Sequence, residues 1–285
     1  MNITKDCVEC IVGQINKAIV HLKLDEETAK TIQEEVLKKS KSFSFEHTPP
    51  YVAREVYEYL ALQTNCSDPL ERIKQESIEN ALEFVPFIEK KIRQEEDKLF
   101  TAIKASVAGN VIDFGAKEQF CLEEEINKVF HTNFAIDHYS KLLKQLENKK
   151  SVLILADNAG ENVFDKILIK IIKRLYPNKH ITYATRGKPI INDITTKEAI
   201  QIGIDKFATV MSTGVDTPGL ELSRANTSFR SIFEKAELII SKGMGNFECL
   251  EASKDKRIFF LFKVKCNVVA NAIGKEIGDI ILKQG

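Results

Sequence analysis

Three side chains in the second half of the chain carry oxygen atoms of the kind that bind a hard divalent cation. Asp157 and Asn158 directly follow one short apolar run, and Asp193 comes soon after the next. Hard cations prefer carboxylate and amide oxygens and usually keep water or a substrate phosphate in their remaining positions. The two aspartates also suit the N-caps of the helices that follow them. Spacing alone leaves the metal-binding and the capping interpretation open.

A lysine and a glycine-containing segment could bind an anion beside such a cation. Lys265 lies just beyond an apolar run, where its ammonium group could contact a phosphate oxygen. The alternative is a surface lysine whose aliphatic stem packs on its neighbours. Gly243, Met244, Gly245 and Asn246 could present backbone N–H groups to a ligand. A single GxG is weak evidence for a dinucleotide site.

A third segment interrupts the first half of the chain near its end. Gly109 and Asn110 stand there, followed by Asp113. The segment either reaches across to the same cleft, which would place Asn110 at the substrate, or only breaks a helix. We favour the first interpretation.

The cysteines and histidines carry a weaker signal. Of six cysteines, only Cys7 and Cys10 form a CxxC, and no second CxxC or CxxH follows. Because a closed zinc site needs about four ligands, the pair represents either ordinary thiols on a helix or a metal- or redox-sensitive pair. The five histidines show no ligand spacing, and neither a GxSxG motif nor a P-loop is present.

Short apolar runs alternate with helical segments in the second half of the chain. This alternation predicts a mainly parallel, doubly wound sheet with helices on both faces, in which ligands bind beyond the carboxyl ends of the strands. Asp157, Gly243 and Lys265 each follow such a strand. The expected strands are Ser151–Ala156, His180–Thr185, Phe207–Met211, Leu238–Ile240 and Ile258–Phe262.

Glycine divides the chain into two regions. The first 108 residues contain one glycine, Gly13, and the remaining 177 contain the other twelve. Glycine-poor sequence suits helices, and glycine-rich sequence suits the tight turns between strands and helices. We therefore expect a helical N-terminal domain over residues 1–112 and an α/β/α Rossmann-like domain, carrying the metal site, over residues 113–285.

Composition limits the class of protein. Lys and Arg number 41, as do Asp and Glu, so the formal net charge is zero. A general nucleic-acid binder usually has a basic excess, and a membrane span needs roughly 18 or more apolar residues, which no stretch provides. Residues 1–7 contain no apolar secretory core. We expect a cytoplasmic protein without nucleic-acid or membrane partners.

Taken together and in order, seven motifs resemble the DUF89 family, also called the ARMT1-like or damage-control phosphatase family. The similarity runs from about residue 5 to about residue 280 and is greatest to the small microbial branch with an N-terminal CxxC. The motifs are Cys7 with Cys10, Thr48-Pro49-Pro50, Gly109-Asn110 with Asp113, Asp157-Asn158-Ala159-Gly160-Glu161, Arg186-Gly187 with Asn192-Asp193, Ser241-Lys242-Gly243-Met244-Gly245-Asn246-Phe247-Glu248, and Lys263-Val264-Lys265-Cys266.

The resemblance implies a metal-dependent phosphatase that hydrolyses phosphate monoesters of small metabolites, either sugar phosphates or damaged metabolite phosphates. It implies a helical N-terminal region packed on a three-layer α/β/α sandwich. Its metal ligands carry over to Asp157, Asn158 and Asp193, and its phosphate-binding lysine to Lys265. Larger eukaryotic members have Arg-Thr-x-Lys there, whereas this chain has Lys263-Val264-Lys265, so only the lysine role carries over.

On this hypothesis the cofactor is Mn²⁺, Co²⁺, Ni²⁺ or Mg²⁺, and the attacking group is a water or the Asp157 carboxylate. Glu161 would orient a water or act as an outer ligand, and Lys265 would balance phosphoryl charge. The catalytic set is then Asp157, Lys265 and Glu161. The expected substrate-binding set is Asn110, Asp216, Gly243, Gly245 and Asn246, with Asp216 binding a substrate hydroxyl. The substrate is a small phosphorylated metabolite, and no pattern indicates the oligomeric state.

Two other functions remain open at this point. One is an S-adenosylmethionine-dependent carboxyl methyltransferase, a role also proposed within this family, for which Gly243 and Gly245 would have to form the adenosine site. The other is a metal- or redox-binding module based on Cys7 and Cys10.

Overall fold

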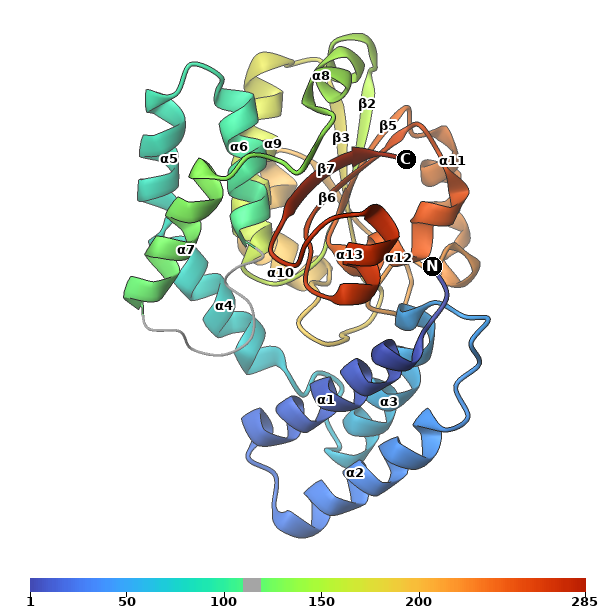
Figure 1. Cartoon of the computed structure of the whole chain (residues 1–285). Helices are drawn as coiled ribbons and strands as arrows, with labels where there is room; N and C mark the ends of the chain where they lie inside the picture. Colours follow the sequence, from blue (N-terminus) through green and yellow to red (C-terminus); the bar gives the residue numbers. More distant parts are fainter. Residues whose placement is uncertain (110–118) are drawn as a thin grey trace.

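A seven-stranded sheet forms the centre of the molecule in the computed structural model, which describes residues 1–109 and 119–285 (Figure 1). The strand order is β1-β7-β6-β5-β2-β3-β4, and all neighbours are parallel except β6 and β7. The predicted mainly parallel, doubly wound sheet is therefore confirmed. The strands are β1 (Ile136–Asp137), β2 (Ser151–Leu155), β3 (His180–Thr185), β4 (Thr209–Ser212), β5 (Leu238–Lys242), β6 (Ile258–Lys263) and β7 (Ile280–Gln284).

The order of the strands reverses between β2 and β5. From β2 the chain proceeds to β3 and β4 on one side, and later to β5 and β6 on the other. The carboxyl ends of β2 and β5 therefore flank a crevice of the kind in which open α/β sheets bind ligands.

Helices cover both faces of the sheet. The α-helices are α1 (Lys5–Leu22), α2 (Glu26–Ser40), α3 (Pro49–Gln63), α4 (Glu71–Glu83), α5 (Val85–Gln94), α6 (Lys98–Ala108), α7 (Gln119–His131), α8 (Tyr139–Asn148), α9 (Glu161–Leu175), α10 (Thr196–Gln201), α11 (Thr227–Lys235), α12 (Met244–Leu250) and α13 (Asn267–Ile273).

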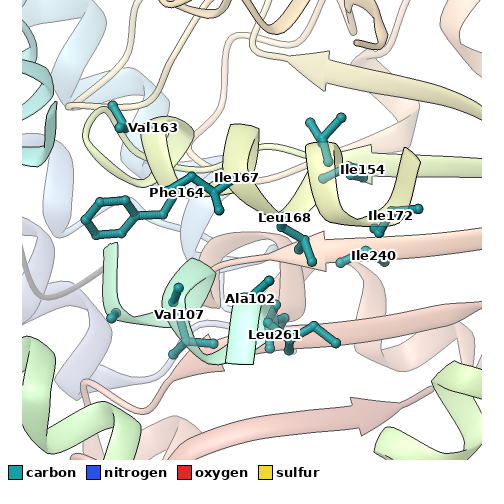
Figure 2. Close-up of a cluster of buried hydrophobic side chains, with 14 of the residues drawn as sticks. Ala102, Val107, Ile154, Val163, Phe164, Ile167, Leu168, Ile172, Ile240 and Leu261 are labelled. Atoms are coloured by element: carbon teal, nitrogen blue, oxygen red, sulfur yellow. The ribbon is translucent and has the colours of Figure 1, made fainter. Parts of the chain in front are cut away.

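Successive residues of each strand enter different cores, as the two-residue period of a strand requires. Ile154 of β2 packs on the face covered by α6 and α9, together with Ile240 and Leu261 from the neighbouring strands (Figure 2). Leu153 and Leu155 face the other side, where α11, α12 and α13 pack. The result is the expected three-layer sandwich.

The first three helices have a core of their own and lie together at one end of the molecule (Figure 1). Their starts follow from the sequence, because Asp25 caps α2 and Thr48 caps α3, which opens with two prolines. By contrast, α4, α5 and α6 contribute to the core of the sheet. The cores thus divide between α3 and α4, whereas the expected boundary at residue 112 falls outside the described residues. Among the described helices, none is long and apolar enough to cross a membrane.

Candidate active site

The two segments that carry the predicted metal ligands are hydrogen-bonded to each other. Asn158 and Asp193 form an isolated β-bridge, and the Ile194 amide donates to the Asp157 carbonyl at 3.0 Å. The turn before Asp193 contains Ile191 with φ of 46°. A β-branched residue in this left-handed region is strained, and such strain is concentrated at functional sites. The structure therefore brings all three predicted ligands to one place beyond β2 and β3.

Neither aspartate caps a helix. Gly160 stands at the N-cap of α9, and Thr195 caps α10 in a capping box with Glu198. The capping alternative for Asp157 and Asp193 thus loses its basis, and their carboxylates need another explanation.

Arg186, which follows β3, contacts the carboxylates of both Asp157 and Asp193. Its Nε donates to Asp193 Oδ2 at 2.5 Å, its Nη1 donates to Asn246 at 2.9 Å, and its Nη2 lies 3.5 Å from Asp157 Oδ1. The arginine side chain is 2% exposed, and Nη2 has no hydrogen bond to any described residue. One buried guanidinium therefore contacts both carboxylates, and the charges of Lys265 and Lys242 add to it at Asp157.

The pKa of Asp157 reflects this crowding. Burial and, after it, the charge of Asp193 raise the pKa of Asp157 to about 7, although Arg186 acts in the opposite direction. Two carboxylates that repel each other in a buried place favour a bound cation. Asn158 donates its Nδ2 hydrogens to Asp157 and Glu161, so its amide oxygen is the atom left for a ligand role. The donor set fits one hard divalent ion.

Gly243 makes room for the Asp157 carboxylate. A Cβ at Gly243 would lie 1.9 Å from Asp157 Oδ2, and the residue has φ of 77°. A Cβ at Gly245 would likewise lie 1.9 Å from the carbonyl oxygen of Pro218. Both glycines of the GxG therefore have a packing reason within the protein, so the motif needs no adenosine site to explain it.

A buried polar network lies beneath the ligands. Lys242 Nζ, which is inaccessible to solvent, donates to Glu161 at 3.0 Å and to Asp165 at 2.7 Å. Burial alone would lower the pKa of Lys242, but the carboxylates of Asp165 and Glu161 outweigh it and raise that pKa. Because Glu161 also accepts from Asn158, this network fixes the orientation of the amide. Glu161 itself does not line the described cavity.

A cavity of about 690 Å³ opens in front of the three ligands. One wall comes from α1 and α3, and the other from the sheet ends and from Lys265. Cys7 and Cys10 also line it. Among the side chains that the structure describes, in residues 1–109, 124 and 126–285, no group of three or more His, Cys, Asp or Glu could hold a metal ion. The cysteine pair therefore lacks a third ligand of these types among them.

Comparison with known proteins places the chain in a family. The model of the damage-control phosphatase ARMT1-like domain matches residues 3–281. The chain belongs to the ARMT1-like damage-control phosphatase family. A damage-control phosphatase of Pyrococcus horikoshii is 31% identical over 99% of this chain and 97% of its own length. One of Archaeoglobus fulgidus is 31% identical over 99% of both chains.

A solved structure agrees with this assignment. The crystal structure of a DUF89 family protein from Pyrococcus horikoshii matches with a TM-score of 0.92 at 29% identity, covering 100% of this chain and 99% of the other. The family makes this chain a metal-dependent phosphatase of small phosphorylated metabolites, as the sequence motifs predicted.

Other predicted residues of this family member occupy different places. Asn246 is fully buried and bonds Arg186, the Leu220 amide and two carbonyls. Asp216 forms a bidentate salt bridge with Arg224 and does not line the described cavity. Both differ from the expected substrate contacts. Asn110 lies outside the described residues.

Sequence reasoning gave no role to Arg186 or Lys242. Each stands at the end of an apolar strand, and a charge at that position is the signal that could have identified them. A buried charge is rare unless it is paired. Their partners, however, come from distant segments that only the fold brings together.

Proposed function

We propose that one divalent cation binds Asp157, Asn158 and Asp193 and that the phosphoryl group of a metabolite monoester binds beside it in the cavity. The joint placement of these three side chains with Lys265 on one cavity wall supports this assignment. Mn²⁺, Co²⁺, Ni²⁺ and Mg²⁺ all suit an oxygen donor set. When bound, such an ion would withdraw charge from the phosphoryl oxygens.

The remaining residues bind and orient the substrate. Lys265 is exposed in the cavity, where its ammonium group can balance the negative charge that develops on the transferring phosphoryl group. Arg186 keeps Asp193 fixed, and the Glu161–Lys242 pair keeps the Asn158 amide oriented. Partners of this kind commonly change metal affinity or activity by about 10- to 100-fold when they are removed.

The test is hydrolysis of p-nitrophenyl phosphate and of a panel of sugar phosphates and cofactor fragments with each of the four metals. We expect Asp157→Asn and Asp193→Asn to lose about 100-fold or more in activity and to bind metal weakly in calorimetry. Asp216→Asn is the matched control, because that carboxylate pairs with Arg224 away from the cavity lining. Full metal-dependent activity in both of the first two variants would contradict the assignment.

A further inference from the structure

Gly13 has no structural reason to be glycine. Every other glycine in the described part of the chain either has a positive φ or would place a Cβ less than 3.0 Å from another atom. A Cβ at Gly13 would meet nothing within 4 Å, and its backbone is ordinary α-helix.

The glycine also weakens the helix that contains it. Gly13 lies near the middle of the 18-residue helix α1. Glycine is the least favourable residue in a helix interior after proline, because it loses the most backbone freedom on folding. The fold would thus be more stable with alanine at this position.

The open space at Gly13 belongs to the active-site cavity. Cys10, Gly13, Gln14 and Lys17 all line the cavity, and their spacing places them on one face of α1. Gly13 stands between Cys10 and Lys17 on that face, so its missing side chain leaves a notch in the wall. The α1–α3 unit supplies this wall opposite the sheet ends (Figure 1).

The walls of the notch are polar on one side and apolar on the other. The Tyr57 hydroxyl donates to Gln14 Oε1 at 3.2 Å, which fixes the amide of Gln14 at the cavity. Pro50 and Ala53 of α3 add apolar surface. Asp6 and Lys17 bring opposite charges to the two ends of the α1 face, so this wall has no net charge.

We propose that the notch at Gly13 is the subsite for the alcohol part of the substrate, which is an uncharged body with hydroxyl or amide groups. This inference rests on the proposed phosphatase function, with the phosphoryl group at Asp157, Asp193 and Lys265. A volume of about 690 Å³ exceeds the needs of a phosphoryl group alone and lies in the range of about 300–1,000 Å³ that holds drug-sized ligands. Gln14 supplies amide hydrogen bonds to the body, and the missing Cβ gives it room.

The experiment compares Gly13→Ala and Gly13→Leu with wild type. Gly13→Ala should raise the melting temperature by about 2 °C, because it improves the helix without a clash. Gly13→Leu fills the notch and should raise KM about tenfold or more for the long, neutral monoesters that wild type hydrolyses best. The inhibition constant of inorganic phosphate and the metal affinity should stay within roughly twofold, since neither ligand reaches α1.

Glu9→Leu is the matched control, because it adds the same side chain to an exposed position of α1 that does not line the cavity. If Gly13→Leu changes KM no more than Glu9→Leu does, the subsite proposal is wrong and the phosphatase function stands. If Gly13→Leu instead weakens inorganic phosphate as much as the long esters, the notch belongs to the phosphoryl site and the proposal is again wrong. If wild type hydrolyses no ester with any of the four metals, the proposed function fails and the subsite fails with it.

Discussion

Acidic side chains outnumber basic ones in the lining of the cavity. Asp157 and Asp193 share one guanidinium, and Glu248 on the same cavity wall belongs to α12. Burial raises the pKa of Glu248 to about 7, opposed by the N-terminal ammonium group and supported by the charge of Asp157. A bound cation would therefore enter a region that already favours positive charge.

Glu248 gives a pH-dependent prediction. The folded state holds the proton of Glu248 more tightly than the unfolded chain, whose glutamate pKa is about 4.3. Stability from this group is therefore greatest at low pH and falls as the pH rises from about 4.3 to about 7. Glu248→Gln cannot ionise, so at pH 8 the metal-free variant should be more stable than wild type by on the order of 3–4 kcal/mol.

The measurement is thermal unfolding of wild type and variant in metal-free buffers between pH 4.5 and 8.5. The difference between the two should be small at pH 4.5 and should grow toward pH 8. Glu9→Gln, at an exposed position of α1, should show no such trend. A constant difference across the pH range would mean that Glu248 does not titrate in this interval.

The candidate metal ligands could be predicted from the sequence, because their donor chemistry and their position after strands are local properties. Asp157, Asn158 and Asp193 needed only the alternation of strands and helices to be placed at one edge. The roles of Arg186 and Lys242 could not be predicted in this way. The sequence pattern of a charged residue at a strand end is the same whether the side chain faces solvent or a buried carboxylate. Asn246 was misplaced for the same reason, because an amide after a glycine turn can face either way.

At the level of elements, the turn from β5 into α12 determines whether Asp157 can lie where it does. Gly243→Ala would place a methyl group on the Asp157 carboxylate in addition to straining a φ of 77°. Gly278→Ala is the matched control, since Gly278 has φ of 99° and open space around its Cβ position. Both variants should lose about 1–3 kcal/mol of stability from backbone strain, but only Gly243→Ala should lose metal binding in calorimetry. Equal metal affinity in the two would contradict the contact.

The elements themselves were predicted unevenly. The five expected strands all exist, with ends shifted by no more than two residues. β1 and β7 were missed: β1 has only two residues, and β7 pairs antiparallel to β6 at the chain end, outside the alternating pattern. In the helical N-terminal region, α4 and α5 are divided at Phe84, shortly before Pro86 in the first turn of α5.

At the scale of the whole molecule, the balanced charge of 41 basic and 41 acidic residues conceals a local excess of carboxylates at the cavity. The helical unit and the sandwich have separate cores, and the cavity lies between them. A ligand long enough to fill the cavity would contact both units. Global composition therefore says little about the charge of the substrate, which is set by the few groups that the fold brings to this cavity.

Metal binding should be measurable as stability of the whole protein. An ion that binds only the folded state stabilises it by about 2.7 kcal/mol at a hundredfold excess over Kd, which for a chain of this size is about 5–10 °C in melting temperature. We expect this rise when Mn²⁺ or Co²⁺ is added to chelator-treated protein, and its loss in Asp193→Asn. The double variant Cys7→Ser with Cys10→Ser should keep it. A shift that persists in Asp193→Asn and disappears in the cysteine variant would place the ion on the thiols of α1, because no change in the sheet could then account for it.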